Sequence, residues 1–424
     1  MHISRHLIIG HIKMIVIKMR NRIWSLIVAM VFALSTFATS IETDHTWYLA
    51  GEAMTVHITA DKAMIAYAEL CDIQGLAAGV MVSLKGGEGT GIIELPSNLH
   101  SGYYVLSVYT RDDAHVSQRL VAVVNPLRKR VDDDIEWIKI THPDSLSYDN
   151  EGEKEGWRVG EKDVDVCESE GHIVKARVKN VHDHPFSGSD IRPSMSIIGK
   201  QIHYFEGEMA NDSTAVFYTY GLHGRLPLVL SAISSTGVSL PIEIISPFAT
   251  LLPKQLPHLV FHYNRSEVEA RSLDMQRHQM AIAHADDRPS VYDDTAFGTK
   301  PDLTYNLDEY RQFLTIREVL LEYVVCVEKK KVDGVQKLLV RIEPDHYDNI
   351  LPSLVLIDGM PVFDIERLLN YDARRIHYIN IYGGQYTFGQ DIYNGILSFV
   401  TRSGRLTNYP IDPDMQYLEY DFPE

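Results

Sequence analysis

Asp358 is the residue whose type and position come nearest to those of a catalytic carboxylate. It directly follows the apolar run Leu354–Ile357 and precedes Gly359, and loops that follow strands often carry functional side chains. The same Asp-Gly pair is also strong turn chemistry, because Asp accepts nearby backbone N–H groups and Gly tolerates a positive φ. No second carboxylate or His stands at a spacing that would complete an acid/base pair. The sequence therefore favours a structural turn at Asp358.

Glycines downstream of this turn are candidates for a ligand-binding loop: Gly383, Gly384, Gly389 and Gly395. Glycine-rich loops cradle phosphates when they join a strand to a helix, and no such context surrounds these residues, so tight backbone turns are the favoured interpretation. Aromatic residues lie among them, and either an exposed contact patch or core packing would explain their presence. These aromatic residues are Tyr382, Tyr386, Phe388 and Tyr393.

Histidine and cysteine positions give little support to a metal site. His182-Asp183-His184 could supply ligands, but the segment is more typical of a polar turn before a proline. His278 and His284 lack the i, i+4 spacing that places two ligands on one helix face. The cysteines, which lie far apart without metal-site spacing, are interpreted as small buried hydrophobic residues, and an oxidising compartment permits one disulfide among them. They are Cys71, Cys167 and Cys326.

Sequence motifs with a defined chemistry also give no support to a catalytic or metal-binding site. The chain contains no G-x-S-x-G, H-E-x-x-H, Walker loop, Rossmann glycine pattern or EF-hand loop. We therefore predict no catalytic residue, no metal and no cofactor, and we do not expect an enzyme. The formal net charge of -17 argues against nucleic acid or an anionic membrane surface as the main partner.

The N-terminus has the order of a secretory signal peptide. A basic segment from Met19 to Arg22 precedes the apolar run Ile23–Leu34, and the small residues Ala38-Thr39-Ser40 follow. This pattern predicts cleavage before Ile41, with Met19 as an alternative start. The apolar run is shorter than the roughly 20 residues that a membrane-spanning helix needs. Residues 1–40 are therefore predicted to direct export, and the mature chain to reside in the periplasm or at the outer membrane.

Residues 41–125 have the features of an antiparallel β-sandwich. Segments rich in β-branched and aromatic residues follow one another closely, with Gly-rich turns between them and no long helical pattern. The segments around Gly51-Glu52, Leu95-Pro96 and Ser101–Tyr103 resemble the macroglobulin-type domain of the alpha-2-macroglobulin superfamily, an immunoglobulin-like sandwich. The thioester of that superfamily needs a Cys-x-Glu-Gln arrangement. Here Cys167-Glu168-Ser169-Glu170 lacks the glutamine, so covalent trapping is not expected.

The middle of the chain alternates between polar and β-rich composition. Residues 126–167 are acidic and predicted to be a linker. Residues 168–248 carry further strand patterns and are predicted to form a second sandwich-like domain. Residues 249–304 are predicted to be another linker, with a short helix around Asp274 to Ala285.

Residues 305–405 change to an α+β pattern. Tyr310, Phe313, Ile316, Leu320 and Val324 have the spacing of an amphipathic helix, and strand patterns and a short helical segment follow. The order of motifs resembles the plug domain of TonB-dependent outer-membrane receptors, with Phe388 in place of the usual tyrosine. The residues that carry the resemblance are Glu318, Asp358, Gly359, Pro361, Gly383, Gly384, Phe388, Gly389, Asn394, Gly395 and Gly404.

The resemblance implies a plug-like domain without a receptor barrel. A transmembrane barrel needs many strands of about 10 residues, and the tail 406–424 is too short to encode one, so transport by this chain alone is not expected. The predicted fold class is multi-domain, with N-terminal all-β Ig-like sandwiches and a C-terminal α+β plug-like domain. The expected function is a non-catalytic interaction protein that binds an outer-membrane or periplasmic partner. The alternative is a surface adhesive or ligand-binding β-sandwich protein.

Overall fold

The computed structural model describes most of the chain outside the N-terminal segment. The described residues are 39–60, 63–128, 133–140, 156–179, 186–199, 202–285, 296–332, 335–342, 351–406 and 408–424. The predicted signal peptide lies almost wholly outside them, as do His182–His184 and the side chain of His284. No helix in the described ranges is long and apolar enough to cross a membrane.

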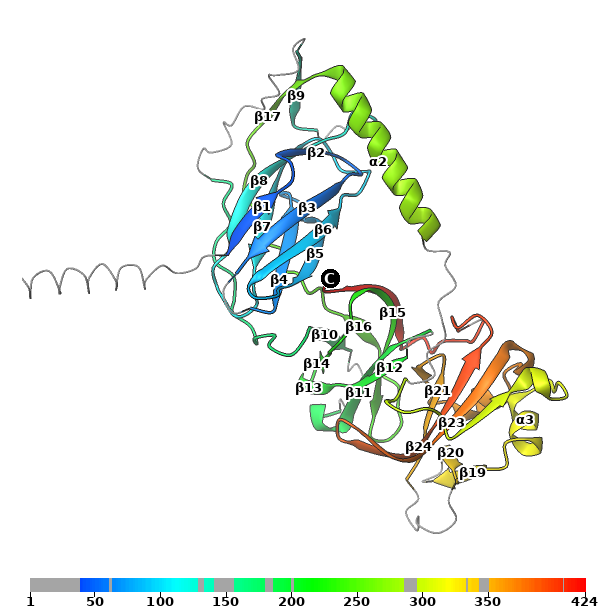
Figure 1. Ribbon diagram of the computed structural model, residues 1–424. Helices are drawn as coiled ribbons and strands as arrows, with labels where there is room; N and C mark the ends of the chain where they lie inside the picture. The colour runs from blue at the N-terminus through cyan, green and yellow to red at the C-terminus, as the bar shows by residue number, and fades with distance from the viewer. Residues whose placement is uncertain are drawn as a thin grey trace, which may run out of the picture.

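The first domain is a β-sandwich of two antiparallel-rich sheets (Figure 1). Alternation along the strands fills its core, so that Met54, Val56 and Ile58 point inward while their neighbours are more exposed. One sheet has the order β1 (Ser40–Thr43), β3 (Ala53–Thr59), β6 (Glu88–Glu94). The other has the order β2 (Trp47–Leu49), β8 (Ser117–Val124), β7 (Gly102–Tyr109), β4 (Ile65–Cys71), β5 (Leu76–Ser83).

The second domain is also a sandwich, and one of its strands comes from the C-terminal tail. One sheet has the order β13 (Glu208–Asn211), β14 (Thr214–Tyr218), β10 (Ile173–Val178), β16 (Ile242–Ile244). The other has the order β12 (His203–Glu206), β11 (Ile191–Ile197), β15 (Gly224–Ser234), β25 (Gln416–Phe422), and a short 3-10 helix, η3 (Gly188–Asp190), precedes β11. The description of residues 406–424 as a tail was therefore wrong. Their alternating Tyr420 and Phe422 enter the core of this sandwich.

The third domain has a five-stranded mixed sheet with two short helices. Its strand order is β18 (Leu303–Asn306), β23 (Ile376–Phe388), β24 (Asp391–Thr401), β21 (Leu354–Ile357), β22 (Met360–Pro361). Beside the sheet lie α3 (Ile316–Glu322), α4 (Ile365–Leu369), the 3-10 turns η4 (Leu307–Glu309) and η5 (Ala373–Arg375), and the hairpin β19 (Val327–Val332) and β20 (Val335–Val340). The structure shows this α+β fold; the likeness to a receptor plug stays a prediction.

Helix α3 is shorter than the sequence pattern predicts. The apolar spacing starts at Tyr310, but the helix begins only after Thr315, whose side chain accepts a hydrogen bond from the backbone N–H of Glu318. The Glu318 side chain in turn accepts from the N–H of Thr315, which completes a capping box. The cap therefore fixes the start of the helix, and the preceding aromatic residues pack outside it.

Both segments predicted as linkers contain ordered elements. Strand β9 (Ile135–Lys139) pairs in parallel with β17 (Leu259–Tyr263), and α2 (Arg265–Ala285) lies along the first sandwich (Figure 1). The helix is longer than predicted because its contacts are tertiary. Arg271 binds the Glu52 carboxylate with two nitrogens and stacks on Trp47. Val268 and Met275 of the helix are also buried, in one cluster with Trp47 and Leu49 of the first sandwich.

The three cysteines are free thiols. Cys71 is buried and Cys326 is half-buried, in agreement with their interpretation as small apolar residues. Cys167 is exposed, so that interpretation was wrong for it.

The chain passes more than once between the three domains. After β16 the chain returns to the first sandwich as β17 and α2, then forms the third domain, and finally re-enters the second sandwich as β25 (Figure 1). Beyond β25, Glu424 pairs through its backbone with Met81 and Ser83 at the edge of the first sandwich. The third domain is thus an insertion within the second sandwich.

Candidate functional site

Asp358 and Gly359 form the turn that the sequence predicts, and the Asp358 side chain is buried inside it. Their φ values are 48° and 95°, as a two-residue hairpin turn between β21 and β22 requires. The carboxylate accepts hydrogen bonds from the backbone N–H groups of Thr401 and Leu406 and from the Thr401 hydroxyl. Burial raises the pKa of Asp358, while these donors oppose the rise. All of these contacts are internal, so the carboxylate holds β24 and the following loop to the turn.

The same turn rests on the second sandwich. The backbone N–H of Gly199 donates to the carbonyl oxygen of Asp358 at 2.9 Å. A Cβ at Gly359 would lie 2.9 Å from both the Ile197 oxygen and the Ile202 side chain, so only glycine fits this approach. The predicted motif residue Pro361 lies in β22, directly after the turn, and pairs with Leu356 of β21. The motif's Asp-Gly turn is therefore a contact between domains.

A second contact between these domains surrounds Phe388 and Gly389, at the turn between β23 and β24. The Phe388 ring meets the ring of Tyr204 edge-on, with centroids 5.1 Å apart. Gly389, with φ 55°, leaves only 3.0 Å between its Cβ position and the Cβ of Glu206. Next to it, Asp391 accepts a hydrogen bond from Arg192 of the second sandwich. We refer to these two contacts between the third domain and the second sandwich as the joint, and the predicted motif residues Asp358, Gly359, Phe388 and Gly389 lie at it.

Glu206 is the perturbed group of this joint. Burial, and then the neighbouring Asp391 carboxylate, raise its pKa to about 7. The backbone N–H groups of Gln390 and Asp391 and the charge of Arg192 act in the opposite direction. Its Oε2 atom is buried and finds no hydrogen-bond partner in the described part of the chain.

The remaining predicted glycines of the motif lie where β23 and β24 pair with each other. Gly383, Gly384, Asn394 and Gly395 line a cavity of about 280 Å³ together with Asp302 and two apolar residues. The N–H of Gly383 donates to Asp302 at 2.6 Å. Gly384 (φ 85°) and Gly395 (φ 82°) lie within strands β23 and β24, where the pairing register shifts between Tyr382 and Gln385, so an irregularity in strand pairing stands where tight turns were predicted.

The aromatic residues of this region pack together more than they face solvent. Tyr382 is buried, while Tyr386, Phe388 and Tyr393 are half-buried around a cluster that includes Tyr204. The sequence left open whether these aromatic residues form an exposed contact patch or pack in the core, and the structure shows that they pack in the core.

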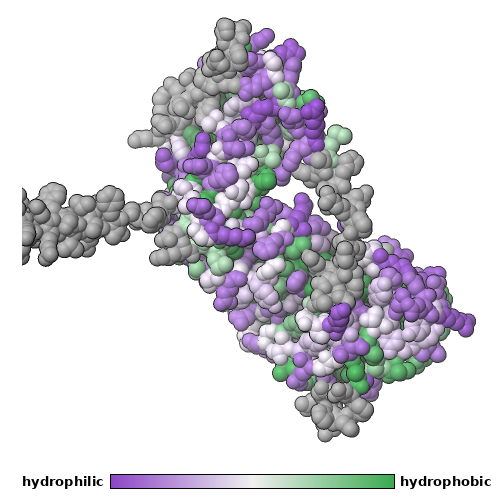
Figure 2. Space-filling model, viewed as in Figure 1, coloured by the Kyte–Doolittle hydropathy of each residue, from purple (hydrophilic) through white to green (hydrophobic). Residues whose placement is uncertain are grey.

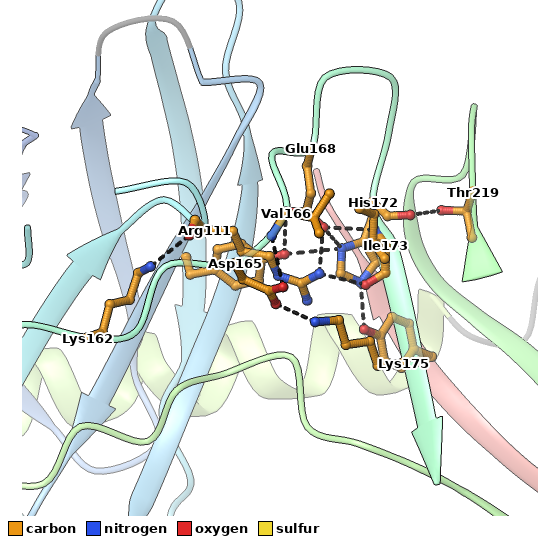
Figure 3. Close-up of polar contacts among 11 residues, drawn as sticks. Arg111, Lys162, Asp165, Val166, Glu168, His172, Ile173, Lys175 and Thr219 are labelled. Atoms are coloured by element: carbon orange, nitrogen blue, oxygen red, sulfur yellow. Dashed lines mark hydrogen bonds and ion pairs between the residues drawn. The ribbon is translucent and has the colours of Figure 1, made fainter. Parts of the chain in front are cut away.

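A third polar cluster, which the sequence analysis missed, joins the first and second sandwiches (Figure 3). Glu168 accepts hydrogen bonds from Tyr67, His172 and the N–H of Ile173, at 2.6, 2.9 and 2.8 Å. Arg111 completes the set with an ion pair to Glu168 at 3.1 Å. His172 and Ile173 are close to Glu168 in the sequence, but Tyr67 and Arg111 come from strands of the first sandwich that are far away in the chain. The local sequence therefore does not reveal the complete cluster.

Hydrogen bonds link the side chains of Glu168, His172 and Tyr420 in a row, an arrangement that resembles a carboxylate–imidazole relay. The far nitrogen of His172, Nε2, lies 2.7 Å from the Tyr420 hydroxyl. Burial lowers the pKa of His172. Burial alone would raise the pKa of Glu168, but the hydrogen bond from His172 and the charge of Arg111 lower it. The pair is thus an ionised carboxylate and a neutral imidazole.

This cluster is enclosed by protein. The side chains of Glu168 and His172 are only 3% and 2% exposed, which leaves no room for a substrate beside them. No group of three or more potential ligand side chains within the described ranges could hold a metal ion. The arrangement therefore serves as a polar joint between the two sandwiches.

Comparison with known proteins gives distant structural similarity only. The sequence matches no protein-family model and no curated protein. A BSP domain of a biofilm-associated protein is 12% identical with a TM-score of 0.17, over 53% of this chain and 32% of that one. Native alpha-2-macroglobulin of E. coli is 11% identical with a TM-score of 0.18, over 51% of this chain and 15% of that one.

The adhesin InvE of Yersinia pseudotuberculosis is 10% identical with a TM-score of 0.16, over 51% of this chain and 63% of that one. The chain therefore covers less than two thirds of the length of each of these proteins. Similarities at these TM-scores carry no functional argument. The class of the chain, a multi-domain protein built largely on β-sandwiches, follows from its own sheet topology.

Proposed function

We propose that the chain is a non-catalytic, exported interaction protein of the bacterial envelope, and that its third domain docks on an outer-membrane or periplasmic protein. The observation that carries this proposal is an exposed apolar surface on and beside α3, formed by Leu314, Leu321 and Val325, which we refer to as the α3 surface. Their exposed fractions are 63%, 76% and 83%. Exposed apolar patches often mark interaction sites.

The mounting of α3 explains why this surface stays exposed. Ile316, Val319 and Leu320 of the helix are buried in the core of the third domain. The helix cannot rotate to hide Leu321 without removing those three residues from the core. Figure 1 shows α3 on the side of the third domain that faces away from the second sandwich, and Figure 2 shows hydrophobic atoms along the lower edge of the same domain.

The contacts with the second sandwich also favour docking through the side of the third domain that carries α3. The predicted motif residues Asp358, Gly359, Phe388 and Gly389 are used within the chain, against strands β11 and β12. The third domain therefore presents its helical side to other molecules. In this proposal the sandwiches act as a rigid mount for that side.

Site-specific photocrosslinking in native envelopes tests the proposal. A photoreactive residue at Leu321 is expected to yield a discrete adduct with one envelope protein. The same residue at Asp421, an exposed position on the second sandwich, serves as the matched control and should not yield that adduct. Leu321→Asp should abolish copurification of the same protein. Equal adduct patterns at both positions, or none at Leu321, would rule out docking through the α3 surface.

A second candidate function is adhesion at the cell surface through a sandwich domain. The observation that favours it is a pair of exposed tyrosines near the end of β14, Tyr218 and Tyr220, with exposed fractions of 56% and 69%. Tyrosine provides a large contact area together with a hydrogen-bonding hydroxyl. Protease treatment of intact cells separates the two functions, since cleavage of the chain supports adhesion and protection supports a periplasmic partner.

A further inference from the structure

One of the two contacts between the second sandwich and the third domain is made by the turn between β23 and β24. The turn between β23 and β24 reaches across to β11 and β12, where Phe388 meets Tyr204 and Asp391 meets Arg192. The close approach of Gly389 to Glu206 sets the distance between the two domains at this point. Any change in the Glu206 side chain therefore acts directly on the fit of the turn.

Glu206 is placed so that its charge works against this contact. Its Oε2 is buried without a partner in the described residues, and a buried carboxylate that lacks full hydrogen bonding is costly when ionised. The N–H groups of Gln390 and Asp391 donate to the carboxylate, but they do not fully offset the cost of burying its charge. Asp391 adds a second negative charge from the other side of the joint.

Other charged and titratable groups around Glu206 come from each element packed against it. Arg192 on β11 is shared, since it pairs with Asp391 and also attracts Glu206. Lys337 on β20 lies within electrostatic reach of Asp391, and burial lowers its pKa. Tyr204 and Tyr393 interact electrostatically with both carboxylates, and burial raises the pKa of both tyrosines. The single guanidinium of Arg192 thus faces two carboxylates when both are ionised.

We propose that Glu206 is a pH-sensitive latch, which in its protonated form holds the turn between β23 and β24 against the second sandwich and in its ionised form loosens it. The proposal is independent of docking through α3. Its direction follows from linkage. A carboxyl whose pKa is raised in the docked state stabilises that state at low pH, and the stabilisation is lost as the pH rises toward about 7. The third domain is thus held most firmly under mildly acidic conditions.

Hydrogen–deuterium exchange of the full chain tests the latch, with rates corrected for intrinsic exchange at each pH. Amides of residues 389–393 are expected to exchange up to about tenfold faster at about pH 8 than at about pH 6, if the docked carboxyl titrates near pH 7. Glu206→Gln, which resembles the protonated form, should make protection independent of pH over this range. Glu208→Gln, at an exposed carboxylate on the neighbouring strand, should behave like the wild type.

A second variant tests the same idea if Glu206→Gln folds poorly. Asp391→Asn removes the opposing carboxylate and frees Arg192 to face Glu206, so the midpoint of the transition should move to lower pH. Protection that does not change between these pH values in the wild type would overturn the proposal. An unchanged pH response in Glu206→Gln, or an unmoved midpoint in Asp391→Asn, would overturn it as well.

Discussion

The carboxylate of Asp358 accepts two backbone N–H groups and one hydroxyl in a buried position. Replacing it with alanine would leave these donors without an acceptor, and we expect Asp358→Ala to destabilise the third domain by about 3 kcal/mol. Asp358→Asn keeps one carbonyl oxygen and tolerates the positive φ, so its loss should be smaller. Hydrogen exchange of amides in β21 and β24 measures both. Equal protection in Asp358→Ala and the wild type would contradict this structural role.

The cluster of Arg111, Glu168 and His172 should make the joint between the sandwiches acid-labile. His172 and Glu168 both have lowered pKa values in the folded chain. Their contribution is therefore complete at neutral pH. It declines below about pH 6.5, where an exposed His gains a proton, and further below about pH 4.5, where an exposed Glu does.

Glu168→Gln tests this dependence. Breaking a buried ion pair costs about 3–5 kcal/mol, so the variant should open this joint at neutral pH and show a weaker response to acid. Exchange of amides near Ile173 follows the opening. Glu170→Gln, at an exposed neighbouring residue, should match the wild type, and a similar loss in both variants would contradict the assignment.

Residue-scale prediction from the sequence succeeded where the chemistry is local. The Asp358-Gly359 turn needs only its own two residues and their backbone preferences, so the pattern was sufficient. Glu206 and Glu168 acquire their properties from Asp391 and from Arg111 and Tyr67, which lie far away in the chain. A sequence without the fold does not show which charges will be neighbours.

Helix α2 shows how a polar contact fixes an element. Arg271 binds Glu52 with two nitrogens at 2.9 and 2.6 Å, and its guanidinium lies 3.9 Å from the centre of the Trp47 ring. Lysine cannot reproduce both the two-pronged contact and the stacking. We therefore expect Arg271→Lys to weaken the attachment of α2 by about 1–2 kcal/mol.

Hydrogen exchange along α2 measures the effect of Arg271→Lys. Arg277→Lys provides a control on the same helix, because its ion pair with Asp274 is largely exposed and exposed pairs contribute little. Faster exchange in the Arg277 variant than in the Arg271 variant would refute the importance of this contact.

At the scale of elements, the sequence predicted strands better than helices. The strands carry alternating apolar residues that mark their buried face, as in β3. The extent of α2 depends on contacts with Glu52 and Trp47, and that of α3 on the cap at Thr315. Neither contributes to the apolar periodicity from which helices were predicted.

At the scale of the whole molecule, β25 is the strand that closes the second sandwich. It pairs with β15 over its full length and brings Tyr420 and Phe422 into the core. Deletion of residues 416–424 should expose the edge of β15 and remove the Tyr420 contact with His172. We expect the shortened chain to aggregate or to lose protease resistance in the second domain.

Limited proteolysis with mass spectrometry checks this deletion. Tyr417→Ser, at an exposed position on the same strand, is the control and should leave the digestion pattern unchanged. A stable second domain in the shortened chain would show that β25 is dispensable. The sequence could not predict this pairing, since a strand pattern does not name its partner.

The return of β25 also sets an order of events during synthesis. The backbone N–H of Ile244 donates a hydrogen bond to the side-chain oxygen of Gln416, which is 172 residues further along the chain. Closing so long a loop is slow compared with forming local contacts. The second sandwich keeps an open edge at β15 until residues 416–422 have been synthesised and can pair with it. Its completion therefore follows the synthesis of the inserted third domain.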